Sequence, residues 1–180
     1  MQIIHSSELI IQSILKTGIL KAYSENKTEL HIYTDKIRKL SPETKLNYNL
    51  VIYLMHCLSK QQHFLESIGY TFYTLCLNDI LMIDNKYFFC IDPKLIMRID
   101  KNKQLTFYKP PLNSEFNSPE LLAINSIPFK ISYKIIYYSF GALAIYCLGK
   151  YLNCYKYTKL YWFIQRCINS EIEQRQLLFI

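Results

Sequence analysis

The residues that most often carry chemistry in proteins are scattered along this sequence. Its six cysteines include no CxxC pair and no cysteine–histidine cluster at zinc-ligand spacing, and most lie within apolar runs (Cys57, Cys76, Cys90, Cys147, Cys154, Cys167). Buried free thiols in a reducing compartment are therefore favoured over disulfides. His56 and His63 lie on one expected helix, but no third ligand is near them, so they do not indicate a metal site.

The sequence also contains no glycine-rich phosphate loop. Such loops hold phosphate oxygens with backbone N–H groups, which requires closely spaced glycines. The chain has four glycines, and no two of them are close together (Gly18, Gly69, Gly141, Gly149). We therefore expect no GxGxxG lid over a nucleotide.

The aspartates beside expected turns include Asp79 and Asp92, which residue type alone does not set apart from the others. Carboxylate oxygens are the ligands that Mg²⁺ prefers. Aspartate is also common in turns, because its side chain accepts hydrogen bonds from nearby backbone N–H groups. The residue types alone leave both interpretations open.

The elements that would position these aspartates are a long helix and two hairpins. Ser41-Pro42-Glu43 is typical of a helix start, and apolar residues recur at helical spacing until Gly69, a natural helix stop. The β-type runs 80–83 and 87–91 flank turn residues and predict one hairpin. The runs 95–99 and 105–108 predict a second hairpin, which ends at Pro110-Pro111.

The rest of the chain adds three expected helices. The segment 135–148 is apolar almost throughout but is too short to span a bilayer, so we expect a helix buried on all sides. Apolar spacing predicts an amphipathic helix at 160–168 and a short helix from there to the C-terminus. Residues 1–40 contain only weak signals, for a helix at 8–20 and a strand at 29–34.

Composition predicts a folded, single-domain protein. Half of its 180 residues are apolar, 19% are charged, and the formal net charge is +7. This charge would suit an acidic partner such as nucleic acid or an anionic surface, but the lysines are dispersed, which favours a solvated surface. Residues 1–9 show no secretory signal pattern, so we expect an intracellular protein with no membrane association.

Three stretches, in order, resemble the C-lobe of protein kinases, and the likeness runs from Ser41 to Ile180. The first comprises 65–70 and 78–84, similar to the kinase long helix, catalytic loop and following strand. The second comprises 116–121, similar to the APE element, and 137–141, similar to the start of the buried kinase helix. The third comprises Cys167-Ile168 and Arg175. Stretches 133–134, 137–139 and 158–162 resemble parts of the divergent kinase-like proteins of large DNA viruses.

The resemblance implies a structural ion pair and an inactive site. Glu120 matches the APE glutamate and Arg175 matches its arginine partner. Asp79 falls at the metal-binding asparagine and Asp92 near the DFG aspartate, so Mg²⁺ binding at Asp79 and Asp92 would follow from the family. The other matched positions lack the required chemistry, since Thr74 replaces the catalytic aspartate and cannot act as a base at neutral pH. The remaining replacements are Phe72 for the HRD histidine, Cys76 for the loop lysine, and Ile136 for the aspartate that opens the buried helix.

The resemblance therefore predicts a mainly α fold with small β-hairpins, in which 41–180 form a protein-kinase-like C-lobe and 1–40 are a short extension in place of a reduced or absent N-lobe. The expected function is that of a pseudokinase, with no catalytic residues and no cofactor, that binds a protein partner in the cytoplasm of a host cell. The alternative is a weak serine/threonine kinase completed by a partner and using Mg·ATP. Nucleic-acid binding is a third hypothesis, resting on charge alone.

Overall fold

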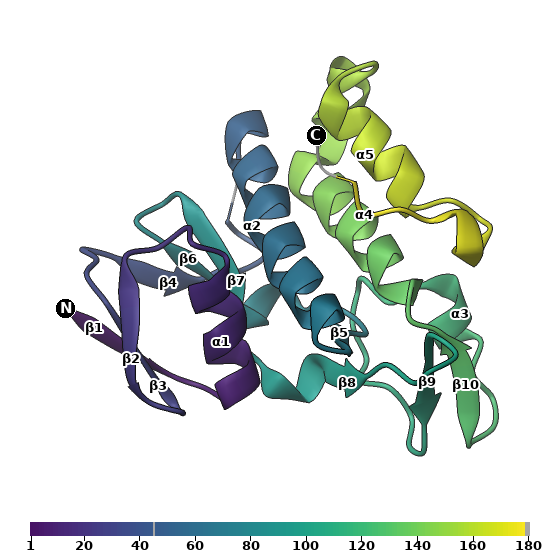
Figure 1. Ribbon diagram of the computed structural model, residues 1–180. Helices are drawn as coiled ribbons and strands as arrows, with labels where there is room; N and C mark the ends of the chain where they lie inside the picture. The colour runs from purple at the N-terminus through teal and green to yellow at the C-terminus, as the bar shows by residue number, and fades with distance from the viewer. Residues whose placement is uncertain (45, 179–180) are drawn as a thin grey trace.

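A computed structural model of the protein describes residues 1–44 and 46–178, and over these residues the chain is a mixed α+β protein (Figure 1). Within these residues, five α-helices are interspersed with ten short strands, which form four small antiparallel sheets. The fold class expected from the sequence, a mainly α kinase-like C-lobe with a reduced or absent N-lobe, is therefore wrong. The elements, in chain order, are β1 (Gln2–His5), α1 (Glu8–Lys16), β2 (Ala22–Asn26), β3 (Glu29–Ile32), β4 (Ile37–Lys39), α2 (Tyr48–Ser67), β5 (Tyr70–Phe72), η1 (Leu77–Asp79), β6 (Ile80–Ile83), β7 (Tyr87–Cys90), η2 (Pro93–Leu95), β8 (Ile96–Arg98), β9 (Gln104–Phe107), α3 (Pro119–Leu122), β10 (Phe129–Ser132), α4 (Ile135–Leu148), η3 (Gly149–Tyr155), α5 (Lys159–Cys167) and η4 (Ile172–Gln174).

The first 32 residues account for much of the error in fold class. They form a three-stranded sheet in the order β1-β3-β2, with α1 joining β1 to β2. The weak helix and strand expected here are present in shorter form, as α1 and β3. β1 and β2 were not expected. β1 is only four residues long, and β2 carries Glu25 and Asn26, which have low β propensity. Pairing with β3, which comes later in the chain than both, holds them in the sheet.

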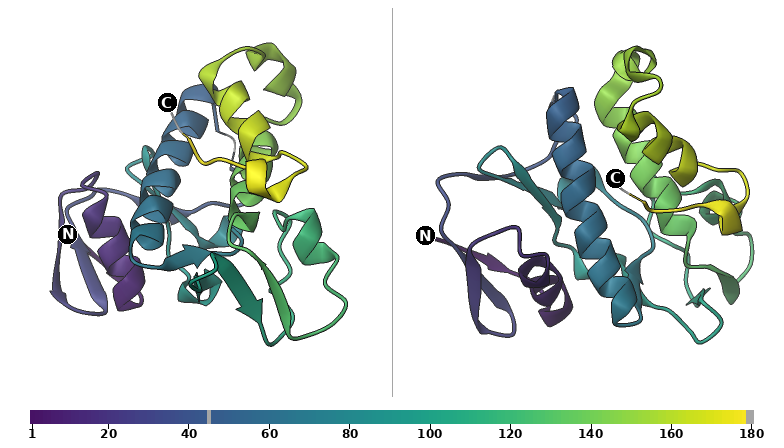
Figure 2. Two further views of the ribbon diagram at one scale, coloured as in Figure 1. Left: turned by 45° about the vertical axis from the view of Figure 1, so that its right-hand side comes forward. Right: turned by 45° about the horizontal axis from the view of Figure 1, so that its top comes forward.

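The long helix α2 lies at the centre of the molecule. In the views of Figures 1 and 2, α1 with its sheet lies on one side of α2, and α4 with α5 lies on the other. The predicted start at Ser41 is wrong: Ser41 belongs to a turn in which Thr44 N donates to Ser41 O (2.8 Å), and Asn47 caps the helix by accepting from Leu50 N (3.0 Å). The predicted stop is confirmed, because Gly69 follows the helix with φ 79°.

Two neighbouring glutamines connect α2 to the elements around it. The side chain of Gln61 donates from Nε2 to Cys90 O (2.8 Å) and to Ser13 Oγ (2.9 Å), and its Oε1 accepts from Cys90 N (2.9 Å). Gln62 donates from Nε2 to Thr71 Oγ1 (2.7 Å) and accepts from Phe72 N (3.2 Å). Both glutamines are fully buried, so these bonds fix β7, β5 and α1 against one helix.

The first predicted hairpin is confirmed and the second is wrong. β6 and β7 pair around Asp84 and Asn85, which both have positive φ, a conformation that Asp and Asn tolerate. In place of the second hairpin, β8 pairs with β5 and β9 pairs with β10. The local sequence favoured pairing of β8 with β9, its neighbour in the chain. In the structure β5 and β10, which lie farther away in the chain, pair with them instead.

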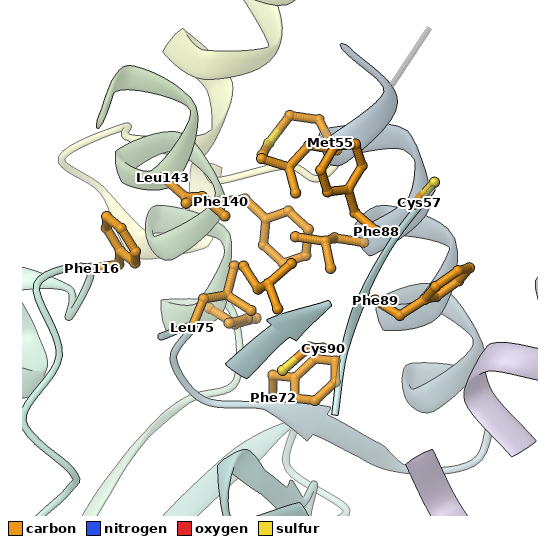
Figure 3. Packing of buried hydrophobic residues seen from close by; sticks show 14 of the residues in the cluster. Met55, Cys57, Phe72, Leu75, Phe88, Phe89, Cys90, Phe116, Phe140 and Leu143 are labelled. Atoms are coloured by element: carbon orange, nitrogen blue, oxygen red, sulfur yellow. The ribbon is translucent and has the colours of Figure 1, made fainter. Parts of the chain in front are cut away.

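The helix predicted at 135–148 is confirmed as α4, which is largely buried but exposes Tyr146. Figure 3 shows side chains of α2, β5, β7 and α4 meeting in one cluster, with Met55, Phe88 and Phe140 among them. A methyl group on Gly141 would overlap Ile168 Cγ2 and lie 3.0 Å from Cys167 Cβ, so glycine permits the close approach of α4 and α5. In the described part of the chain, no helix is both long and apolar enough to cross a bilayer.

The C-terminal segment differs from its prediction. The amphipathic helix expected at 160–168 is present as α5. The short helix expected after it is a single 3₁₀ turn, η4, followed by extended chain to Leu178. The last two residues of the expected helix, 179 and 180, lie outside the described residues.

Replacing Gln61 with leucine should strongly destabilise the protein. The change preserves volume but leaves Cys90 N and Cys90 O, both buried, without their partner. Each unpaired group costs about 1–3 kcal/mol. Urea unfolding of Gln61→Leu beside Gln165→Leu, which alters an exposed glutamine on α5, measures the difference. Equal unfolding midpoints for the two variants would show that the amide has no role in stability.

Candidate functional site

The candidate site is the loop 73–79 between β5 and β6, together with Asp92 after β7. Phe72 precedes this loop and Thr74 lies near its start, and both side chains are fully buried. Thr74 Oγ1 donates to Leu75 O at 3.5 Å, a long bond that directs the hydroxyl to the backbone. Phe72 and Thr74 therefore serve as packing residues, and neither presents a group to solvent.

The structure brings Asp79 and Asp92 to the same end of the β6–β7 hairpin. Ile91 N donates to Asp79 O (2.9 Å), which ties the segment before Asp92 to Asp79. Burial and then the negative charge of Asp92 raise the pKa of Asp79, and the positive charge of Lys39 opposes the shift. Asp92 Oδ1 accepts from Lys94 N (2.9 Å), so Asp92 also caps the turn η2.

The chemistry open to this loop is limited. Burial raises the pKa of the Cys76 thiol, which keeps it protonated and a poor nucleophile. Asp79 and Asp92 form a pair of carboxylates, and within the described residues no group of three or more His, Cys, Asp or Glu side chains is arranged to hold a metal ion. A metal bound here would take most of its ligands from water or phosphate. Ile136, where the resemblance implies that an aspartate has been replaced, is fully buried on α4.

The structure also brings Glu120 and Arg175 together, in a two-pronged ion pair. Arg175 Nη1 donates to Glu120 Oε2 (3.1 Å) and Nη2 donates to Oε1 (2.6 Å). Local sequence places the glutamate: Ser118 caps α3, Pro119 fits the first helical position, and Glu120 falls in the first turn.

Arg175 is deeply buried for a charged residue, with its side chain 1% exposed. Its Nε donates to Asn169 O (2.8 Å), and its guanidinium lies 5.3 Å from the ring centre of Tyr138. Burial would raise the pKa of Glu120, but hydrogen bonds, chiefly from Arg175, outweigh it and lower that pKa. The pair thus joins α3, α4 and the turn after α5.

One feature of the site had no signal in the sequence analysis, a cavity of about 400 Å³ beside Tyr73. Tyr73 packs edge-on against Phe107, with ring centres 5.4 Å apart, and its hydroxyl accepts from Leu112 N (3.2 Å). The cavity exists because β8 and β9 do not pair. The hairpin expected from the sequence would leave no space between these strands, so the sequence did not predict a cavity here. Pro110-Pro111, which was interpreted as a strand stop, forms part of its wall.

No protein-family model matches this chain, and no curated protein matches it either. The proposed function therefore rests on the residues and their geometry.

Replacing Arg175 with alanine should cost about 3–5 kcal/mol of folding free energy, because it leaves the Glu120 carboxylate without its partner. Chemical denaturation of Arg175→Ala measures this. The matched control is Arg98→Ala, at an exposed position on β8, for which a change of about 0.5 kcal/mol or less is expected.

Acid unfolding gives a second readout of the same pair. Because the pKa of Glu120 is lowered in the folded state, its contribution is present above the ordinary value of 4.5 and is lost as pH falls through the lowered pKa. Glu120→Gln should therefore lose stability at neutral pH and lose less than the parent chain on acidification. Parallel pH profiles for parent and variant would contradict the ion-pair assignment.

Proposed function

We propose that this chain is a catalytically inactive relative of protein kinases that acts inside cells as a protein-interaction or regulatory module. The observation that carries the proposal is the contrast between two regions that resemble kinases, the Glu120–Arg175 pair and the loop 73–79. The Glu120–Arg175 pair is formed, with Arg175 buried and Glu120 partly buried, whereas Thr74, which the resemblance matches to the catalytic base, lies in the core. The residues that support structure are in place, and those that would transfer phosphate are replaced.

The surface supports an interaction role. Large aromatic side chains are well exposed, with Tyr108 78%, Tyr157 81% and Trp162 48% accessible. Tyrosine and tryptophan are enriched among residues that anchor protein interfaces.

An intracellular location in a host cell is part of the same proposal. None of the six cysteines forms a disulfide, as expected in a reducing compartment. The host-cell cytoplasm follows from the resemblance to kinase-like proteins of large DNA viruses. Nucleic acid and membranes are not proposed as partners.

The second candidate function is a weak or partner-completed serine/threonine kinase. The proximity of Asp79 and Asp92 favours it, because two carboxylates could share a Mg²⁺ ion that also binds phosphate oxygens. This function would require another chain to supply the remaining phosphate contacts.

Thermal unfolding with and without Mg·ATP separates the two candidates. A ligand well above its dissociation constant must stabilise the state it binds, so bound Mg·ATP would raise Tm. Because the proposal has the phosphate-transfer residues replaced, we expect no rise at millimolar Mg·ATP. An active protein kinase is the positive control. A rise that Asp79→Asn/Asp92→Asn abolishes would contradict the inactive assignment and support the second candidate.

The interaction role is tested by capture from cells with the intact chain as bait. We expect a reproducible protein partner that is recovered by the parent chain and by Asp79→Asn/Asp92→Asn alike, because binding does not use the carboxylates. Arg175→Ala, which should be partly unfolded, is the control for capture through denatured protein. Recovery by Arg175→Ala alone, or of no protein at all, would remove the interaction role.

A further inference from the structure

A tight turn joins β8 to β9, but the two strands do not pair with each other. The turn between them is tightly bonded: Asp100 N donates to Gln104 O (2.9 Å), and the Asp100 carboxylate accepts from Asn102 N and Gln104 N (2.8 Å each). Lys103, with φ 58°, completes the turn. Beyond this turn the two strands do not pair with each other.

Each strand instead lies at the edge of a two-stranded sheet. β8 pairs with β5, and β9 pairs with β10. Within the described residues neither strand has a partner on its other side. Two-stranded sheets are marginal alone, and an edge strand presents unpaired backbone groups to any extended chain that can reach it.

Hydrogen bonds to β5 identify the free groups on β8. Tyr73 N donates to Leu95 O (3.0 Å) and Ile99 N donates to Gly69 O (2.9 Å), so alternate residues of this segment face β5. Because an antiparallel ladder alternates, the N–H of Arg98 points to the opposite edge.

The cavity of about 400 Å³ lies between the separated strands. Ile96 and Met97 of β8 line it, as do Thr106 and Phe107 of β9. Pro93, Pro110 and Pro111 form the rest of an apolar and conformationally restricted wall. The cavity could take one or two apolar side chains of a bound segment.

The charges around the cavity are mainly positive. Lys94 and Lys109 lie on its lining, and both are exposed. The segment 92–111 carries five basic residues and two aspartates, and the Asp100 carboxylate is engaged by the turn. An occupant with acidic side chains would complement this rim.

We propose that this site binds an extended acidic peptide segment of a protein partner, which adds as a strand along the free edge of β8. Its apolar side chains enter the cavity and its carboxylates lie near Lys94 and Lys109. The inference rests on the proposed interaction function and assigns that function a surface and a partner chemistry. Backbone bonds supply affinity, and the cavity and the lysines supply specificity.

The test uses a fluorescein-labelled peptide of alternating glutamate and valine, titrated into the full chain with fluorescence polarisation as the readout. We expect binding of this peptide and none of its lysine–valine counterpart. Lys94→Glu/Lys109→Glu should weaken binding about tenfold or more. The matched control Lys21→Glu/Lys36→Glu makes the same charge change at exposed positions in residues 1–40 and should bind as the parent does.

Two further measurements separate strand addition from attraction by net charge. Hydrogen exchange should slow at the Arg98 amide on peptide binding, and a peptide methylated at alternate backbone nitrogens should lose affinity. Equal weakening by both lysine pairs, unchanged exchange at Arg98, or full affinity of the methylated peptide would overturn the proposal.

Failure of this assignment can be told apart from failure of the proposed function. If the captured cellular partner binds Lys94→Glu/Lys109→Glu as well as it binds the parent chain, the site is elsewhere and the interaction role stands. If capture yields no partner, the interaction role fails whatever the peptide does.

Discussion

The rest of the structure depends on two buried amides in the middle of α2. Gln61 pairs with both backbone groups of Cys90 and with Ser13, and Gln62 pairs with Thr71 and with the backbone of Phe72. A buried amide or backbone group without a partner costs about 1–3 kcal/mol, so β5 and β7 cannot shift independently of the helix. Since β5 leads into the loop 73–79 and β7 leads to Asp92, one helix positions both halves of the candidate site.

Arg175 imposes a second constraint, on the segment that follows β9. Its guanidinium is bound by Glu120 of α3 and by Asn169 O, which fixes the chain on either side of α4. The segment before α3 is tied to the loop as well: Ser114 Oγ donates to Leu75 O, and Leu112 N donates to Tyr73 Oη. The cavity wall at Pro110 and Pro111 is therefore held near the loop 73–79 by bonds from the residues that follow it.

Sequence reasoning succeeded where the deciding interactions are local and failed where they are distant. The β6–β7 hairpin and the buried helix α4 follow from turn residues and from an unbroken apolar run. β1 and the partners of β8 and β9 depend on pairing between segments farther apart in the chain, which propensity does not encode. β2 pairs locally with β3, but its polar residues did not indicate a strand. Gln61 and Gln62 are visible in the sequence as two polar residues that interrupt the apolar stripe of the long helix.

The site itself was only partly accessible from sequence for the same reason. Asp79 and Asp92 were singled out only by the resemblance to kinases, and their environment comes from the fold: burial and the charge of Asp92 raise the pKa of Asp79, and the charge of Lys39 on β4 opposes this. The turn-capping bond engages Asp92, and the charge of Lys39 partly offsets the burial of Asp79. The free edges of β8 and β9 have no such internal partner within the described residues, so they are the part of this region that another molecule would complete.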